Sequence, residues 1–219
     1  MSRRVAPSLL SPLERPLLLW LAARLPRGVT PDRLTLLGLA GAMISGAGYL
    51  LSRQQPALLW LASLGLLINW FGDSLDGTLA RHRGIERPAY GFFVDHVTDL
   101  FSQLFIGLGL ALCGRIHPAA GALALIAYLM AVAATMIART VTGEMAQSLG
   151  RAGPTEIRLL LVGLNVLLLL RPPQPFLLVR GTPLSRLDLA ILGLAVLAIA
   201  GLALQSLRQA RKLGREPPP

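Results

Sequence analysis

The sequence predicts an all-α, polytopic membrane protein with six transmembrane helices and an N-terminal amphipathic helix on the membrane surface. Hydrophobic residues make up 53% of the 219 residues and charged residues only 15%, a more apolar composition than that of ordinary soluble domains. The apolar residues gather into runs of about 18 or more, the length at which a helix crosses a bilayer. Prolines stand at the starts of several runs, where a helix loses no hydrogen bond to them.

The first element is an N-terminal arm over residues 1–30, which contains a helix at about residues 12–25. Ser11 and Glu14 have the spacing of a capping box, which marks the start of a helix. The alternative is a secretory signal built on the apolar residues 17–23, but two prolines and two charged residues interrupt or precede that stretch. We therefore expect an amphipathic helix that lies on the membrane surface.

A transmembrane catalytic domain is expected over residues 31–207, followed by a basic, Pro-rich tail over 208–219. The six spans are predicted at about residues 34–51, 57–80, 91–113, 118–138, 157–170 and 184–205. Small residues recur within the spans and predict close helix packing in lipid; they are Gly38, Gly41, Gly46, Gly48, Gly107 and Gly109.

The basic residues predict the orientation of the chain. If both termini lie on one side, that side carries 16 of the 21 Lys and Arg residues. The positive-inside rule then places both termini, and the loop after the second span, in the cytoplasm of a bacterial-type inner or plasma membrane. The net charge of +10 does not indicate nucleic-acid binding, because the basic residues stand at the ends of spans without interleaved aromatics. Contact with anionic membrane lipids accounts for them better.

Four aspartates at the cytoplasmic ends of the second and third spans predict a metal site: Asp73, Asp76, Asp95 and Asp99. Ionised carboxylates at membrane depth are costly unless they are paired or bound to a cation. Helical spacing places each pair on one face of its helix, and a short loop makes the two helices antiparallel neighbours. The pairs then converge. Oxygen ligands select hard ions, so Mg²⁺ or Mn²⁺ is expected.

Two further residues suit a phosphate ligand beside these carboxylates. Gly77 has no side chain, so a ligand can approach the helix backbone there. Arg81, one turn further along, carries a guanidinium group that can hold phosphate oxygens. Together with a divalent cation they predict a receptor for a pyrophosphate.

The pattern of these residues resembles the signature of the CDP-alcohol phosphotransferase family, with every defining position filled: Asp73-x-x-Asp76-Gly77-x-x-Ala80-Arg81, nine residues, Gly91-x-x-x-Asp95-x-x-x-Asp99. Six spans, a cytoplasmic signature and an amphipathic leader resemble the family's layout over nearly the whole chain. The segment from Val29 to Thr35 is similar to the one that opens the first span in many members, although Asp32 stands where Asn is frequent.

The resemblance implies transfer of a substituted phosphate from a CDP-alcohol to an acceptor alcohol with release of CMP, in phospholipid biosynthesis. The donor would be CDP-diacylglycerol or of the CDP-choline or CDP-ethanolamine type, and the protein would form a homodimer. It also implies that Asp99 is the general base beside two Mg²⁺ or Mn²⁺ ions. The implied metal residues are Asp73, Asp76, Asp95 and Asp99, and the implied contacts to CDP are Asp73, Gly77, Ala80, Arg81 and Thr35.

The acceptor site is less well determined by the sequence. Arg139, Arg151 and Arg158 surround the cytoplasmic junction of the fourth and fifth spans, where they could bind a phosphorylated acceptor; ordinary orientation charges are an equally weighted alternative. His96 lies between Asp95 and Asp99 in the sequence. On a helix it points about 100° away from Asp95, so we expect a polar contact between helices and not a second base.

Two other classes of function are alternatives. An ion-coupled transporter would place acidic groups near the middle of the bilayer, often at broken helices, whereas these acids stand at one edge. A non-catalytic scaffold with the same fold would be expected to lack one or more of the four aspartates, and all four are present.

Overall fold

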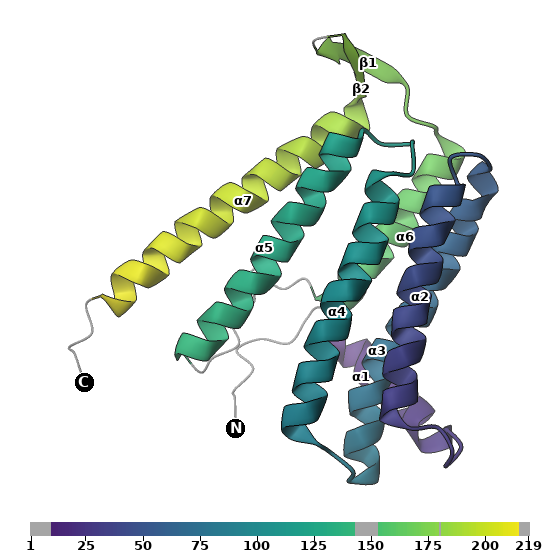
Figure 1. The fold of residues 1–219 in the computed structure, drawn as a ribbon, viewed down its shortest axis with the longest axis vertical. Coiled ribbons are helices and arrows are strands. Elements are labelled where there is room, and N and C mark those ends of the chain that lie inside the picture. The colour runs from purple at the N-terminus through teal and green to yellow at the C-terminus, as the bar shows by residue number, and fades with distance from the viewer. Residues whose placement is uncertain (1–9, 143–152, 180, 215–219) are drawn as a thin grey trace.

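The computed structural model describes residues 10–142, 153–179 and 181–214, which are mostly helical. Six long helices run roughly along one axis, a short helix lies across one end, and a β-hairpin stands at the other end (Figure 1). The elements are α1 (Ser11–Arg24), α2 (Pro31–Leu51), η1 (Pro56–Leu58), α3 (Leu59–Arg83), α4 (Pro88–Ala111), α5 (Pro118–Thr142), α6 (Pro154–Leu170), β1 (Pro175–Val179), β2 (Thr182–Ser185) and α7 (Arg186–Leu213).

A helix is present at each predicted span, and local signals account for the ends. Helices α2, α4, α5 and α6 all begin at a proline. Thr30 caps α2 by accepting a hydrogen bond from the backbone N–H of Arg33, and α3 ends at Gly84 in the left-handed conformation, with φ of 65°. Helix α7 continues to Leu213, past residue 207, because basic residues in a last turn are favourable at the C-terminal end of a helix dipole.

Four segments are long and apolar enough to cross a membrane: Pro31–Leu51, Pro56–Arg83, Pro118–Val141 and Arg186–Leu213. They make the chain an integral membrane protein by composition and length. Helix α4 contains two aspartates, and α6, with 17 residues, stands at the lower limit for a span. Whether α4 and α6 also cross the membrane stays a prediction.

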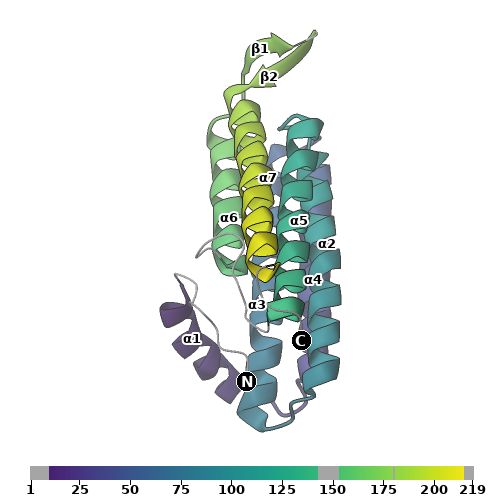
Figure 2. The same ribbon diagram turned by 90° about the vertical axis from the view of Figure 1, so that its left-hand side faces the viewer.

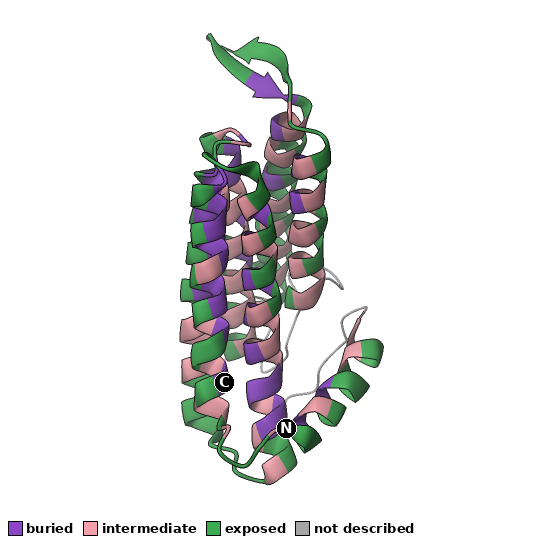
Figure 3. Cartoon of the chain, turned by 90° about the vertical axis from the view of Figure 1, so that its right-hand side faces the viewer, coloured by how far each residue is buried: buried purple, intermediate pink, exposed green. Residues whose placement is uncertain are grey.

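Glycines bring helix α2 into backbone contact with its neighbours, as the sequence predicted. A Cβ atom on Gly41 would lie 2.4 Å from the backbone nitrogen of Asn69 on α3. On the other side of α2, a Cβ atom on Gly46 would lie 2.6 Å from the carbonyl oxygen of Phe105 on α4. Figure 3 shows buried residues following the sides of the helices that face one another. Any side chain at these glycines would force the helices apart.

A methyl group at Gly41 is therefore expected to destabilise the bundle. The clash with backbone cannot be relieved by rotating a side chain, so Gly41→Ala should cost about 1–3 kcal/mol, which corresponds to a fall in melting temperature of about 5 °C in a chain of this size. Gly193→Ala on α7 is the control, because nothing lies within 4 Å of the added atom. Thermal unfolding in detergent measures both, and an equal effect of the two substitutions would contradict this packing.

Helix α1 is anchored to α3 and α6 at the end of the bundle shown at the bottom of Figures 1 and 2. One of its faces packs into a buried cluster of Leu18, Ala22, Leu34, Leu75 and Leu79. The carboxylate of Glu14 accepts hydrogen bonds from Trp70 Nε1 (2.7 Å), Ser74 Oγ (3.1 Å) and Thr155 Oγ1 (2.9 Å).

The capping box predicted at the start of α1 is wrong. The N-cap is Leu10, and no side chain makes a capping hydrogen bond there. Glu14 has the required spacing from Ser11, but hydrogen-bond donors on α3 and α6 bind its carboxylate instead. Local spacing cannot reveal these competing partners. The contact of α1 with a membrane surface stays a prediction.

The hairpin of β1 and β2 was not predicted. Its strands pair antiparallel, with Leu177 opposite Leu184 and Val179 opposite Thr182. The predicted start of the sixth span, residue 184, lies in β2, and the helix begins at Arg186. Ser185 caps this helix by accepting a hydrogen bond from the backbone N–H of Asp188.

Candidate metal and nucleotide site

The site lies between α3 and α4. Helix α2 packs along both of these helices, whereas α3 and α4 themselves come close at few positions. The two helices are antiparallel, as predicted, but α2 intervenes along much of their length. Side chains that α3 and α4 direct toward each other therefore have room to meet beside α2.

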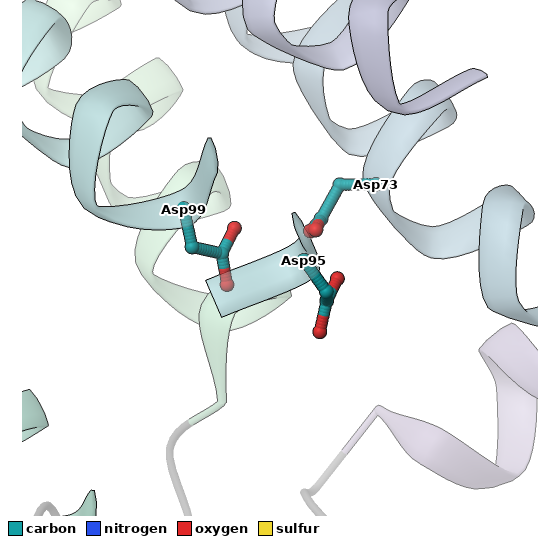
Figure 4. Close-up of side chains that lie close together, drawn as sticks. All are labelled: Asp73, Asp95 and Asp99. Atoms are coloured by element: carbon teal, nitrogen blue, oxygen red, sulfur yellow. The ribbon is translucent and has the colours of Figure 1, made fainter. Parts of the chain in front are cut away.

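Three of the four predicted metal residues come together there. Asp73 comes from α3, and Asp95 and Asp99 come from successive turns of α4. One ligand oxygen of each lies within 4.8 Å of the others, and Figure 4 shows their carboxyl groups gathered around a common space. All three are partly buried. The predicted convergence of the two helices is confirmed for these residues.

The geometry and the chemistry of this donor set fit a small divalent cation. In octahedral coordination at 2.0–2.1 Å, ligand oxygens lie about 2.9 Å apart when adjacent and about 4.2 Å apart when opposite. The three carboxylate oxygens, which lie within 4.8 Å of one another, are close to those separations. Without a cation, three close carboxylates repel one another. The donors are all oxygen, which matches Mg²⁺ or Mn²⁺.

The fourth aspartate has other partners. Asp76 is 7% exposed, and its carboxylate accepts hydrogen bonds from Thr35 Oγ1 at 2.6 Å and from the backbone N–H of Gly77. It is not part of the cluster of three. Thr35, which we predicted as a CDP contact, therefore holds Asp76 against α2. The roles of Asp76 in metal binding and of Thr35 in nucleotide binding stay predictions.

Arg158 on α6 is bound to the aspartate cluster. Its Nη2 donates to Asp73 Oδ2 at 2.6 Å, and its Nε donates to Asn69 Oδ1 at 2.8 Å. Asn69 in turn donates to the carbonyl oxygen of Gly38 at 2.9 Å and to Ser102 Oγ at 3.4 Å. This network joins α6, α3, α2 and α4. Arg158 was predicted as an acceptor contact; the structure shows it bound to a predicted metal ligand, and its role toward an acceptor stays a prediction.

Asn69 is the site residue that the sequence analysis missed. It precedes Asp73 by one helical turn, so both side chains lie on the same face of α3. That spacing was a usable signal, because a buried polar residue in an apolar span needs a partner. Its partner Arg158 is 89 residues away in the sequence, and no local pattern points to it.

Gly77, Ala80 and Arg81 occupy the end of α3 beyond the aspartates. A Cβ atom on Gly77 would lie 3.2 Å from Nη1 of Arg81, so the missing side chain leaves space for the guanidinium group. Ala80 is half-buried and Arg81 is exposed. The guanidinium group of Arg81 therefore lies beside Gly77, where it can bind a ligand that approaches this end of α3.

Arg139 and His96 line a separate cavity between α4 and α5. The cavity has a volume of about 660 Å³ and is lined by Pro88, Ala89, Phe92, His96, Met136, Arg139 and Thr140. The guanidinium carbon of Arg139 lies 4.7 Å from the centre of the Phe92 ring, which also stacks on His96. Arg151, the third predicted acceptor residue, lies outside the described residues.

The polar contact between helices that we predicted for His96 is not found among the residues that the structure describes. Its Nδ1 lies 2.7 Å from the carbonyl oxygen of Phe92 on its own helix, and 3.6 Å from a carboxylate oxygen of Asp95. The carbonyl one turn back is the nearer partner because the ring folds along α4.

Asp32, which stands where Asn is frequent in the family, forms an ion pair with Arg87. Its carboxylate pairs with Arg87 and so joins the start of α2 to the start of α4. This hydrogen bond raises the pKa of Arg87. The two side chains are 47% and 53% exposed, and pairs as exposed as this add little to stability.

The chain is similar in sequence to known proteins. The family model described as CDP-alcohol phosphatidyltransferase matches residues 28–203. The archaetidylinositol phosphate synthase of Pyrococcus horikoshii is 31% identical over 118 residues, which cover 53% of this chain and 57% of that protein. The cholinephosphotransferase 1 of Gallus gallus is 33% identical over 115 residues, 50% of this chain and 34% of that protein. The chain thus matches little more than half of the first relative's length and about a third of the second's.

The fold is also similar to a solved structure. The phosphatidylinositol phosphate synthase of Mycobacterium tuberculosis, crystallised with CDP-DAG bound, superposes with a TM-score of 0.56 at 23% identity, and the match covers 90% of each chain. At this identity the likeness is one of fold.

Proposed function

Because the chain belongs to the CDP-alcohol phosphatidyltransferase family, we propose that it transfers a substituted phosphate from a CDP-alcohol to an acceptor alcohol and releases CMP. The observation that carries this proposal is the meeting of Asp73, Asp95 and Asp99 between two helices of an integral membrane protein. The family match covers the segment that holds all three. Acids at one end of the bundle favour this reaction over transport through it.

Asp99 is proposed as the general base. It would take the proton from the acceptor hydroxyl, whose oxygen then attacks the phosphorus remote from cytidine. The bond from that phosphorus to the bridging oxygen breaks, and CMP leaves with the bonding electrons. Its position in the cluster, close to Asp73 and Asp95, supports this role.

Asp73, Asp76 and Asp95 are proposed to hold two Mg²⁺ or Mn²⁺ ions, with Asp99 close to them. When bound, such ions neutralise the pyrophosphate and the charge that develops on the leaving group. The carboxylate of Asp76 keeps lone pairs for a cation beside the hydrogen bonds that it accepts from Thr35 and Gly77. Arg158 keeps Asp73 oriented toward α4 by binding one of its oxygens.

The CDP group is proposed to lie along the end of α3, over Gly77 and Ala80. Arg81 would bind its phosphate oxygens through charge-assisted hydrogen bonds. The position of the Arg81 guanidinium group over Gly77 and the exposure of Arg81 support this placement.

We propose that the acceptor carries a phosphate group and binds in the cavity between α4 and α5 that Arg139 lines. This cavity adjoins the helix that holds Asp95 and Asp99, and Arg139 supplies a positive charge within its lining. A CDP-diacylglycerol donor would then deliver the lipid, as in a synthase of a phosphatidyl alcohol phosphate. The second candidate is a CDP-choline donor with a lipid acceptor, which the similarity to a cholinephosphotransferase favours.

The membrane arrangement is part of the same proposal. All six helices α2 to α7 would cross the bilayer, with both termini and the aspartates on the cytoplasmic side, and the protein would act as a homodimer. The excess of basic residues at that end supports the orientation.

Release of CMP tests the reaction directly. The purified full-length protein in detergent, with Mg²⁺, is offered CDP-diacylglycerol or CDP-choline together with a panel of acceptors: glycerol phosphate, inositol phosphate, the free alcohols and diacylglycerol. We expect CMP with CDP-diacylglycerol and a phosphorylated acceptor, and loss of that activity in EDTA. CMP with CDP-choline and diacylglycerol would select the second candidate, and no metal-dependent CMP with any pair would refute the reaction.

A further inference from the structure

A second cavity lies at the end of the bundle away from the aspartates. The connections α2–η1, α4–α5 and α6–β1 lie at that end (Figure 1). The cavity has a volume of about 430 Å³ and is lined by Arg53, Cys113, Gly114, Arg115, Pro172 and Pro173. Two arginines contribute to this small lining. The proposed reaction uses none of these residues.

One N–H donor of Arg115 has no acceptor within the described part of the chain. Its Nη2 donates to the carbonyl oxygen of Ser52 at 3.0 Å, whereas its Nε is buried and, within the described part of the chain, meets no acceptor. Buried N–H groups nearly always have a partner. Arg115 lines the cavity, and within the described residues Ser52 takes up only one of the five N–H donors of its guanidinium group, so donors remain for an occupant that supplies an oxygen atom.

Arg53 reaches the same cavity across Gly114. This glycine has φ of +72°, and a Cβ atom on it would lie 3.2 Å from Cγ and 3.3 Å from Nε of Arg53. The absence of a side chain thus permits both the tight turn after α4 and the passage of the arginine. Two guanidinium groups are brought to one cavity as a result.

The positive charge of the pair is not compensated within the part of the chain that the structure describes. Neither arginine forms an ion pair there. Asp188 is the one described acid at this end, and its carboxylate accepts hydrogen bonds from His117 N at 2.6 Å and from Ser185 Oγ at 2.7 Å. A half-enclosed cavity with two unpaired guanidinium groups selects an anion, and their planar forks match phosphate oxygens.

The surroundings of the cavity indicate a lipid. It stands at the ends of membrane-spanning helices, and Pro172 and Pro173 precede strand β1, with Gln174 between them and the strand. Four consecutive side chains of that strand are exposed and apolar: Phe176, Leu177, Leu178 and Val179. An apolar surface beside a cationic cavity fits a molecule that has both acyl chains and a phosphate.

We propose that this cavity, the arginine pocket, binds the phosphate group of an anionic phospholipid in the leaflet opposite the aspartate cluster. The guanidinium groups of Arg53 and Arg115 donate to the phosphate oxygens, and the acyl chains lie along the hairpin. The pocket is separate from the proposed reaction site, so this proposal does not depend on the proposed reaction.

Lipid binding by matched variants tests the pocket. Dioctanoyl phosphatidylglycerol is titrated onto the purified full-length protein in a neutral detergent with EDTA, and binding is followed by native mass spectrometry and by thermal unfolding. The test variant is Arg53→Gln/Arg115→Gln. The control is Arg171→Gln/Arg186→Gln, which removes two arginines from the same end outside the pocket lining. Binding at the aspartate cluster is common to all of these proteins.

Loss of two charge-assisted contacts should weaken the lipid's affinity at least about tenfold in the test variant and leave the control close to wild type. Equal affinity in all three proteins would refute the pocket. Inorganic phosphate is titrated in parallel. If phosphate raises the melting temperature but the lipid does not, and the test variant loses this effect, the pocket binds the free anion and the lipid proposal is wrong. Should the double variant not fold, Arg53→Gln alone serves, since that side chain is exposed, and a smaller weakening is expected.

Discussion

Asp99→Asn should abolish transfer almost completely, with a fall in CMP release of about 10³-fold, within the range for removal of a general base. Asn has the shape of Asp but cannot take a proton from the acceptor hydroxyl. Turnover should fall with every active donor and acceptor pair, because the proton transfer is common to all of them. The measurement is CMP release at saturating substrate and Mg²⁺.

Metal binding separates the two roles proposed for Asp99. If it acts chiefly as a base, Mn²⁺ affinity measured by electron paramagnetic resonance should weaken less than tenfold, since Asp73 and Asp95 remain and the Asn amide oxygen replaces one ligand atom. Glu86→Gln is the charge control, because Glu86 is an exposed acid in the connection between α3 and α4. Full activity of Asp99→Asn would remove the proposed base, and a parallel loss of Mn²⁺ and turnover would make Asp99 a metal ligand.

Periodicity in the sequence was sufficient to predict the helices and the meeting of the two aspartate-bearing faces. Asp95 and Asp99 are one turn apart on α4, and such spacing determines a shared face whatever surrounds it. Proline and glycine marked most helix ends for an equally local reason. These features depend on residues a few positions apart, and they could be predicted.

Partners distant in the sequence could not be predicted in this way. Asp73 and Asp76 share a face of α3, yet their carboxylates bind residues on different helices, Arg158 on α6 and Thr35 on α2. Which rotamer each carboxylate adopts depends on donors that tertiary packing brings within reach. The same holds for Glu14, whose local capping role gave way to donors on α3 and α6.

Arg158 holds α6 to α3 through its bonds to Asp73 and Asn69, a structural role that we did not predict. Its side chain is 12% exposed and that of Asp73 is 19% exposed, so the pair is largely removed from water. Within the described residues, two basic side chains lie within ion-pair distance of the aspartate cluster. They are Arg158, beside Asp73, and the imidazole of His96, beside Asp95. Without the arginine Asp73 would face Asp95 and Asp99 with less positive charge nearby, and Asn69 would lose its bond to α6.

Arg158→Gln should therefore destabilise the protein strongly in the absence of metal. Removal of one partner of a buried ion pair costs about 3–5 kcal/mol, which corresponds to a fall of about 10 °C in melting temperature for a chain of this size. Mg²⁺ should restore much of the loss, since a cation among the carboxylates relieves the same repulsion. Thermal unfolding in EDTA and in Mg²⁺ measures both effects.

The exposed pair of Arg87 and Asp32 provides the matched control. Arg87→Gln also breaks an ion pair between helices, but at that exposure the loss should be at most about 1 kcal/mol, with little response to Mg²⁺. If Arg158→Gln and Arg87→Gln melt alike in EDTA, Arg158 does not stabilise the cluster. If Arg158→Gln is destabilised but Mg²⁺ leaves its melting temperature unchanged, the carboxylates that Arg158 neutralises are not where the cation binds, and the assignment of Asp73 as a metal ligand is wrong.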